Sequence, residues 1–268
     1  MTKDNETIVC REVLKQTIDE DYLTLTMHDI YTFAKEVKID DVKELLDQMI
    51  ACNTAIAQEG MHGDYGANIG KVIAIRKDLP SLLKAYAAAG SDARMNGCEL
   101  PVVINSGSGN QGLTVSVPLI VYAEREHLDK EKLYRALVIS NLTAIHLKTE
   151  IGRLSAFCGA VSAGAACGAG LAYLKDASEE VMNHTIVNAL AITSGIICDG
   201  AKASCAAKIA VSVEAGILGY DMYMNGQQFY GGDGIISKGI ENTIHNIGVL
   251  GSQGMASTDQ EIIKIMCE

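Results

Sequence analysis

The sequence predicts an all-α protein built as a single helical domain, and three observations support this prediction. Proline is rare, with three in 268 residues, so few positions interrupt a helix. Several segments repeat apolar residues at helical spacing. Two long uncharged runs of mostly small residues are typical of helices buried at the centre of a bundle. Alternating segments are too few to form a sheet of any size.

Two parts of the chain are distinguished by their pattern. Residues 1–27 are predicted to be a peripheral N-terminal segment, in which 8–17 can form a short helix and 22–26 alternates like an isolated strand. Residues 28–268 are predicted to form the helical domain, because no linker, repeat or low-complexity segment divides them.

The elements of the helical domain follow from apolar periodicity and from turn residues. Asp40 and Asp41 place negative charge at the start of one helix, as the helix dipole favours. Pro118 lies inside another apolar segment and is expected to kink or restart it. Glycine clusters at 60–66 and 231–234 are predicted to be loops. Helices are predicted over 28–37, 40–57, 79–93, 113–125, 129–148, 154–174, 186–198, 201–224, 235–249 and 259–266.

The run Leu154–Leu174 has 21 residues without a charge, which is long enough to cross a membrane. Its residues are mainly Ala, Gly, Ser and Cys, however, and these transfer weakly into lipid. No asymmetric basic residues flank it as a topology signal would require. We therefore expect a central bundle helix whose small residues let neighbouring backbones approach closely.

Charge and cysteine content exclude several classes of function. The chain has 33 acidic and 22 basic residues and a net charge of −11, which argues against binding nucleic acid or an anionic membrane. The N-terminus shows no export signal, so a reducing, cytoplasmic location is expected. The eight cysteines are then buried thiols, metal ligands or reactive groups rather than disulfides.

The first candidate site is the segment Asn105–Gly112, in which every residue is small or carries an amide. Glycines let backbone N–H groups converge on an anion, and the helix that follows adds positive potential. The P-loop lysine is missing, so a carboxylate suits the segment better than a triphosphate. A flexible turn is the alternative. The candidate binding residues are Ser106, Gly107, Ser108, Gly109, Asn110 and Gln111.

The second candidate site is a set of three cysteines, Cys158, Cys198 and Cys205. Seven residues along an unbroken helix span roughly 10 Å, so Asp199 and Gly200 must break the helix if both later cysteines bind one small cluster. Thiolates select zinc or iron–sulfur clusters. Buried core thiols are the alternative, because the spacing matches no standard ferredoxin or zinc-finger pattern.

Three further side chains are weaker candidates. Arg94 precedes the Asn105–Gly112 segment and could contact a carboxylate, although a surface ion pair with Asp92 explains it equally. His62, in a predicted glycine-rich loop, could act as an acid or base near neutral pH. Lys202 lies between two of the candidate cysteines and could contact substrate or only cap a helix.

Several long motifs occur together in a specific order. They read Ser-Asp-Ala-Arg-Met-x-Gly, Asn-Ser-Gly-Ser-Gly-Asn-Gln-Gly, Arg-Leu-Ser-Ala-x-Cys and Gly-x-Ile-Cys-Asp-Gly-Ala-Lys-x-Ser-Cys, and a late Gly-Ser-Gln-Gly-Met fits as well. From about residue 24 onward the chain resembles the L-cysteine desulfidase family, also classified as the uncharacterised UPF0597 family. That family is related to the alpha chain of iron–sulfur L-serine dehydratase.

This resemblance implies an oxygen-sensitive four-iron four-sulfur cluster bound by Cys158, Cys198 and Cys205, with one iron open. It implies cleavage of L-cysteine to pyruvate, ammonia and sulfide, or dehydration of L-serine. Ser106–Gly112 would then hold the substrate carboxylate, and His62 and Lys202 are the candidate bases. Cys267, the penultimate residue, gives a further hypothesis: its thiol could occupy the open iron until substrate displaces it.

One departure from the family matters. Members of usual length carry an N-terminal Gly-Cys-Thr-Glu-Pro motif associated with catalysis, and this sequence has none; Cys10 lies in a different context. A separate beta-like subunit could supply that part, the sequence could be a fragment, or the chemistry could be lost. The uncharged helices also favour an interface, either in a homo-oligomer or with such a subunit. The competing functional hypothesis is a non-catalytic module that binds a cluster or ligand.

Overall fold

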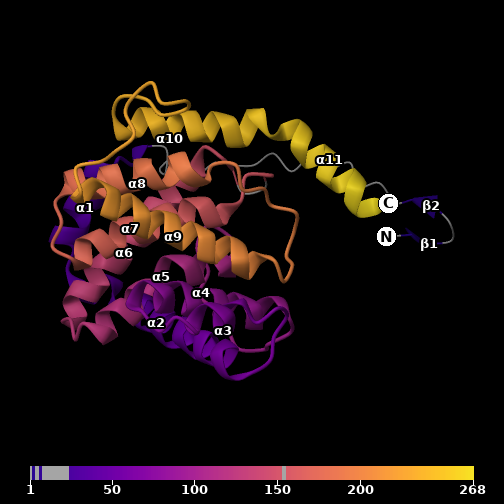
Figure 1. The fold of residues 1–268 in the computed structure, drawn as a ribbon, viewed down its shortest axis with the longest axis horizontal. Helices are drawn as coiled ribbons and strands as arrows, with labels where there is room; N and C mark the ends of the chain where they lie inside the picture. Colours follow the sequence, from indigo (N-terminus) through magenta and orange to yellow (C-terminus); the bar gives the residue numbers. More distant parts are fainter. Residues whose placement is uncertain (1, 4–5, 8–23, 153–154) are drawn as a thin grey trace.

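The computed structural model describes residues 2–3, 6–7, 24–152 and 155–268. Over these residues the chain is all-α, as the sequence predicts, with eleven α-helices and one π-helical turn (Figure 1). Two two-residue strands, β1 (Thr2–Lys3) and β2 (Glu6–Thr7), pair antiparallel near the N-terminus. The helix predicted over 8–17 lies outside the described residues. So does the first part of the strand predicted over 22–26, and its remainder is not strand but leads into the first helix.

The helices follow one another through connections of varied length. They are α1 (Met27–Glu36), α2 (Ile39–His62), α3 (Ile69–Ala74), α4 (Leu79–Met95), α5 (Gly109–Arg125), α6 (Lys130–Thr149), α7 (Gly159–Leu174), α8 (Glu179–Thr193), α9 (Cys205–Met224), α10 (Ile240–Val249), the π-helical η2 (Leu250–Gly254) and α11 (Ala256–Cys267). Each predicted helix of the domain overlaps one of these. The short α3 was not predicted, because six residues show no clear period. The connections before α5, α9 and α10 are the longest.

Several helix boundaries differ from the prediction, and α5 and α8 begin at Gly109 and Glu179 rather than at the predicted 113 and 186. The loop predicted over 60–66 begins only at Gly63, because Gly60 serves packing rather than a turn: a Cβ atom there would lie 1.9 Å from the Ala89 carbonyl oxygen of α4. In addition, α7, α9 and α10 begin four or five residues later than predicted and α8 ends earlier than predicted. Uncharged residues therefore continue into the connections, which apolar content alone could not reveal.

Side-chain caps begin several of the helices. Asp78 accepts a 2.8 Å hydrogen bond from the Ser81 amide at the start of α4, and Asp129 accepts one of 2.7 Å from the Glu131 amide at the start of α6. Ser178 caps α8 in the same way. These residues satisfy amides that a helix leaves unpaired in its first turn. The helices α5, α7 and α9 have neither a side-chain cap nor an acidic residue in the first turn.

The uncharged helix α7 lies at the centre of the bundle and packs on α5, α6, α8 and α9. Glycines set its approach to α9. A Cβ atom at Gly164 would lie 2.3 Å from the Ser212 carbonyl oxygen, and one at Gly168 would lie 2.8 Å from the Cα atom of Gly216. The contacts advance four residues along both helices together, so α7 and α9 run parallel.

Contacts with α7 also give the directions of α5 and α6 relative to it. Gln111 lies against Gly159 and Leu119 against Gly170, so α5 also runs parallel to α7. Ser140 of α6 lies against Gly170 and donates a 2.9 Å hydrogen bond to the Val115 carbonyl of α5. The connection from α6 to α7 is short, so α6 runs antiparallel to α7. One end of the bundle therefore contains the N-termini of α5, α7 and α9 and the C-terminus of α6.

No helix in the described part of the chain combines the length and apolar character needed to cross a bilayer. The 154–174 run instead contributes α7, whose residues are almost all buried by other helices. At the other extreme, α11 buries none of its residues and extends beyond the bundle at the C-terminus (Figure 1).

A buried carboxyl group joins α4 to α3. Asp92 is 1% exposed, and its Oδ2 atom accepts a 2.9 Å hydrogen bond from the Gly70 amide, whereas Oδ1 has no partner. Burial raises the pKa of Asp92 above the ordinary 3.8, although the amides of Gly70 and Ile69 oppose the shift. The folded chain therefore favours the protonated acid.

We expect the Asp92→Asn variant to change the pH dependence of stability. The contribution of Asp92 to the free energy of unfolding is fully present below the ordinary pKa of 3.8. It is lost as the pH rises through the raised pKa of the folded state. Asparagine has no such ionisation. Urea unfolding at several pH values should therefore show wild type losing stability relative to Asp92→Asn as the pH rises above 3.8 and through the raised folded pKa. A difference that stays constant with pH would contradict this assignment.

Candidate metal centre

An isolated antiparallel bridge brings two of the three candidate cysteines together. Phe157 pairs with Ile197 across the segments that precede α7 and follow α8. The Cys158 amide donates to the Ile196 carbonyl at 3.1 Å, and the Cys198 amide donates to the Ala156 carbonyl at 2.7 Å. Residues 40 positions apart in sequence are thereby aligned by backbone pairing alone. Cys158 is the N-cap residue of α7 and is buried, whereas Cys198 is half-buried.

The two aligned thiols interact directly. The interaction between the two thiols raises the pKa of Cys158 and lowers that of Cys198. Burial of Cys158 adds to the first shift. The backbone at Gly200 and the cation of Lys208 contribute further to the lowered pKa of Cys198. Cys198 is therefore the thiolate of the pair, and a thiolate is the form that binds metal.

The third cysteine, Cys205, lies at the same end of the bundle as the pair. Cys205 is the first residue of α9, and its thiol lies 3.6 Å from the Gly200 carbonyl oxygen. The chain is not helical between α8 and α9, and Gly200 has a φ of +91° that favours glycine. This is the break that the spacing of Cys198 and Cys205 requires. Because α7 and α9 run parallel, Cys158 and Cys205 stand at the same end of the bundle.

Among the described residues, no three His, Cys, Asp or Glu side chains stand close enough together to hold a single metal ion. A cubane cluster binds each of its ligands through a different iron, so its thiolates need not meet around one point. The donor set of three thiols, one of them with a lowered pKa, suits such a cluster in chemical type. We call the region around Cys158, Cys198 and Cys205 the cysteine end.

Two lysines at the cysteine end were missed by the sequence reasoning. Lys208 of α9 donates to the Asp199 carboxylate and, at 3.0 Å, to the Ile197 carbonyl. Burial lowers the pKa of Lys208, but Asp199 and the thiols of Cys158 and Cys205 together raise it above its ordinary value, and the same contact lowers the pKa of Asp199. Lys148, near the finish of α6, is 6% exposed. Nothing in their local sequence distinguishes them from surface helix lysines.

The Asn105–Gly112 segment is a tight turn that leads into α5. Asn105 and Ser108 exchange both backbone hydrogen bonds, at 3.1 and 2.9 Å. Ser106 and Gly107 between them have φ values of +47° and +81°, as in a type I′ turn. Ser108 is the N-cap residue of α5, and Gly109 is its first residue. The segment is thus ordered rather than a flexible turn.

This turn is adjacent to the cysteine end through Gln111. A Cβ atom at Gly159 would lie 2.6 Å from the Gln111 side chain, so Gln111 covers the start of α7 directly beside Cys158. Its Oε1 atom is buried without a hydrogen-bond partner. The uncapped starts of α5 and α7 therefore converge, and their amides create positive potential that favours an anion.

Arg94 supports the turn from α4. Its Nη1 atom donates a 3.3 Å hydrogen bond to Asn110 Oδ1, and its Nε atom would lie 2.4 Å from a Cβ atom at Gly109. The guanidinium therefore packs on the first residues of α5. Asp92 instead accepts a hydrogen bond from the Gly70 amide of α3. The surface Asp92–Arg94 ion pair considered from the sequence is therefore absent from the described contacts.

The remaining candidates are more exposed. His62 is the last residue of α2 rather than part of a loop, and its Nδ1 atom lies 2.7 Å from the Gln58 carbonyl oxygen of the same helix. Lys202 is exposed in the turn before α9. Cys267 is exposed near the end of α11, whereas the Met266 methyl group would lie 3.6 Å from a Cβ atom at Gly200. The end of α11 therefore passes close to the connection between Cys198 and Cys205.

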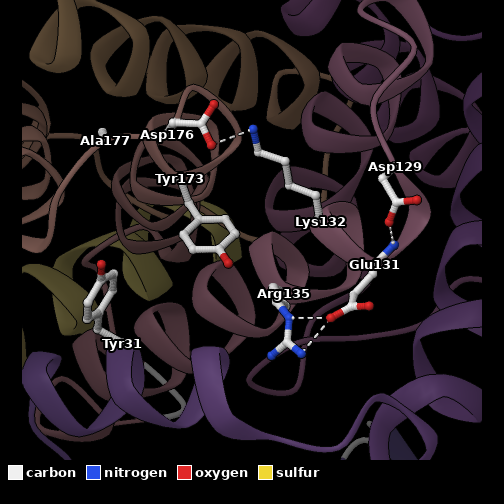
Figure 2. Close-up of a pocket in the computed structure, with 8 residues that line it drawn as sticks. All are labelled: Tyr31, Asp129, Glu131, Lys132, Arg135, Tyr173, Asp176 and Ala177. Carbon is white, nitrogen blue, oxygen red and sulfur yellow. Dashed lines mark hydrogen bonds and ion pairs between the residues drawn. The ribbon is translucent and has the colours of Figure 1, made fainter.

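A pocket of about 420 Å³ lies elsewhere and includes none of these candidates (Figure 2). Lys132 pairs with Asp176 at 2.7 Å, and Arg135 pairs with Glu131 at 2.7 Å. Arg135 also donates to the carbonyls of Ala34 and Lys35 at the end of α1. Arg135 therefore holds the end of α1 against α6, and Lys132 joins α6 to the connection between α7 and α8.

Comparisons with known proteins identify the family of the chain. The family model described as serine dehydratase alpha chain matches residues 7–264. The chain belongs to the serine dehydratase alpha chain family. Relatives include UPF0597 proteins of Desulfitobacterium hafniense (63% identical over 90% of this chain), Lachnoclostridium phytofermentans (52% over 92%) and Finegoldia magna (50% over 93%). No solved structure matches the chain.

The match confirms membership of the family that the motifs resemble, and it covers the cysteine end and the Asn105–Gly112 turn. The chain spans 57% of the length of the Desulfitobacterium hafniense relative and 60% of the other two. The alpha chain family thus accounts for this helical part, and about two fifths of each relative lies outside the matched region.

Proposed function

We propose that the chain is the cluster-binding part of an iron–sulfur lyase that cleaves L-cysteine or dehydrates L-serine. One observation carries the proposal: in a serine dehydratase alpha chain fold, Cys158 and Cys198 are paired where the uncapped starts of α5 and α7 converge. Cys205 stands at the same end as the third ligand. The Gln111 Oε1 atom is buried without a hydrogen-bond partner, which favours a bound group at the cysteine end that donates a hydrogen bond or contains a metal.

The reaction would be an α,β-elimination. A base takes the α-proton, the β-thiol or β-hydroxyl leaves as sulfide or water, and the aminoacrylate product hydrolyses to pyruvate and ammonia. When bound, a four-iron four-sulfur cluster with one open iron supplies a Lewis acid for the leaving group or carboxylate. The Ser106–Gly112 turn would hold the carboxylate through amides at the start of α5. His62 and Lys202 remain the candidate bases.

Several contacts support the ligand roles of the cysteines. Lys208 holds Asp199 and the Ile197 carbonyl, which fixes the backbone on both sides of Cys198. Its cation also acts on the thiols of Cys158 and Cys205. A cationic group beside three thiolates reduces their mutual repulsion and so favours binding of the cluster.

The length of the relatives supports a partner or further domain. This chain covers about three fifths of each relative, and the N-terminal Gly-Cys-Thr-Glu-Pro motif of the resembled family is absent from it. We propose that a separate N-terminal subunit or domain completes the enzyme. The second candidate function is a module that binds a cluster or amino acid without catalysis.

Anaerobic reconstitution with iron and sulfide tests the proposal. We expect about four irons and four labile sulfides per chain, as one cubane requires. Pyruvate formation from L-cysteine and from L-serine is then measured with and without the N-terminal part of a longer relative. Turnover in either case supports the lyase, cluster binding without turnover supports the module, and an iron-free chain overturns both cluster roles.

The hypothesis for Cys267 is tested on the same reconstituted chain. If its thiol occupies the open iron, the Cys267→Ser variant should change the iron spectra while it keeps the iron content. The end of α11 lies near Gly200, so the thiol is within reach of the cysteine end. Spectra identical to those of wild type would contradict the hypothesis.

A further inference from the structure

A cavity of about 790 Å³ lies between the start of α8, the connection from α9 to α10 and Tyr31 of α1. Its volume is in the range of pockets that bind small molecules. The cavity adjoins the first turns of α8, whereas Cys198 follows the end of that helix. The 15 residues of α8 span roughly 22 Å. The cavity is therefore remote from the cysteine end and is a second candidate site.

Hydrogen bonds from helix side chains fix the connection that forms one wall of this cavity. Asn188 of α8 accepts a 3.0 Å hydrogen bond from the Phe229 amide. Asn246 of α10 donates to the Ile235 carbonyl at 2.9 Å and to the Ser237 hydroxyl oxygen at 2.8 Å. The wall is thus held in place by the two helices that it connects and contacts.

Opposite charges line the cavity without pairing with each other. Glu179 and Glu180 lie in the first turn of α8, whereas Lys238 lies just before α10. Glu179 contacts His28 at 3.2 Å, and Glu180 accepts a 2.8 Å hydrogen bond from the Tyr223 hydroxyl. The described ion pairs include none between Lys238 and either glutamate. A cavity that keeps opposite charges apart is complementary to a ligand that carries both.

Two amide side chains that line the cavity also lack partners. Asn183 Oδ1 and Gln228 Oε1 are buried without a hydrogen-bond partner, and no described hydrogen bond reaches the nitrogen of either amide. Such an amide can rotate about its last side-chain bond and so offer a ligand either its oxygen or its nitrogen. Unpaired polar groups are unfavourable in a folded chain, so both amides favour a ligand with hydrogen-bond donors and acceptors.

The rest of the lining is mainly apolar or aromatic. Val187 and Ile236 are buried, and Phe229 and Tyr230 contribute rings. Burial lowers the pKa of His184, so its imidazole is neutral near pH 7 and adds no charge to the cavity. These surfaces suit an apolar group attached to the charged part of a ligand.

We propose that this cavity binds a free α-amino acid with an apolar side chain. The ammonium group of the ligand would face the carboxylates of α8, its carboxylate would face Lys238, and its side chain would pack on Val187 and Ile236. This inference does not rest on the proposed function, because none of these residues belongs to the cysteine end. It gives the chain a second amino-acid site, distinct from the proposed site of elimination.

Calorimetric titration of the full chain with L-phenylalanine, with and without reconstituted iron, tests the inference. We expect a Kd of about 1 mM or tighter, as a ligand of this size can reach, and the same value in both preparations. N-acetyl-L-phenylalanine lacks the ammonium group, and L-phenylalaninamide lacks the carboxylate. Each should therefore bind at least about fivefold more weakly, as the loss of one partly solvated charge contact predicts.

Lys238→Met tests the contact with the carboxylate. The side chain is exposed and makes no described hydrogen bond or ion pair, so the midpoint of unfolding should not change. The variant should bind L-phenylalanine at least about fivefold more weakly than wild type does, but L-phenylalaninamide equally well. Lys238→Arg should retain the affinity for L-phenylalanine. The exposed Lys43→Met of α2 is the control and should match wild type with every ligand.

The other outcomes overturn the inference. They are a wild type that does not bind L-phenylalanine, a wild type that binds all three ligands equally, and Lys238→Met that binds L-phenylalanine like wild type. Equal weakening of L-phenylalanine and its amide in Lys238→Met would show that the lysine does not contact the carboxylate, which also overturns it. A chain that takes up no iron but binds L-phenylalanine as expected would overturn the proposed function alone.

Discussion

Replacing Cys198 with alanine should abolish iron binding, with a fall from about four irons per reconstituted chain to nearly none. Cys198 is the thiolate of the pair with Cys158, and it lies on a connection rather than in a helix. The substitution removes the sulfur but leaves the Cys198–Ala156 backbone hydrogen bond, so the bridge that aligns the two segments remains. Iron and labile sulfide analysis after anaerobic reconstitution measures the effect.

Cys52→Ala provides the matched control. Cys52 is a free, half-buried cysteine of α2, and it is not among the groups acting on the cysteine end. The control should bind iron like wild type. Cys205→Ala should behave like Cys198→Ala, although its thiol is not in contact with the other two. Full iron content in Cys198→Ala, with the fold intact by circular dichroism, would show that Cys198 is not a ligand of the cluster.

Replacing Gly164 with alanine should destabilise the chain by about 3 kcal/mol, the upper part of the range for overpacked cores. The added methyl group would lie 2.3 Å from the Ser212 carbonyl oxygen, and backbone cannot move aside as a flexible side chain can. The helices α7 and α9 must then separate. Urea unfolding followed by circular dichroism measures the loss, and we expect the midpoint to fall with little change in slope.

Gly195→Ala is the matched control, because a Cβ atom at Gly195 would meet nothing within 4 Å. It should change stability by no more than about 0.5 kcal/mol. Gly164→Ala should also lower the iron content, because Cys158 and Cys205 stand at the starts of the two helices that it separates. An unchanged unfolding midpoint in Gly164→Ala would contradict the close parallel packing of α7 and α9.

Local chemistry in the sequence was sufficient to predict many of the helices. The period of apolar residues identified α1, α2 and α4, and the uncharged run at 154–174 indicated the central α7. The loop predicted to begin at Gly60 was wrong, because glycine is common both in turns and where two helices pack closely. Only the neighbouring Ala89 carbonyl decides between these alternatives. The starts of α7 and α9 were also misplaced, since uncharged residues continue on both sides of each boundary.

For the site, the motifs alone identified Cys158, Cys198, Cys205 and the Asn105–Gly112 turn as candidates. Family membership is confirmed independently of the fold. Lys148 and Lys208 could not be found in this way, because a lysine in a helix has no local signature of burial. Their importance follows from which neighbours surround them, and that depends on the packing of α6 and α9 against α7.

The sequence by itself determined the all-α class, the approximate positions of the longer helices and the residue types available for metal binding, because these depend on periodicity and composition within short segments. The tertiary structure decided which of these residues meet. A backbone bridge aligned Cys158 with Cys198, parallel packing through Gly164 and Gly168 brought Cys205 to the same end, and Gln111 joined the turn to α7. Such long-range contacts depend on the mutual fit of whole helices, which no local pattern records.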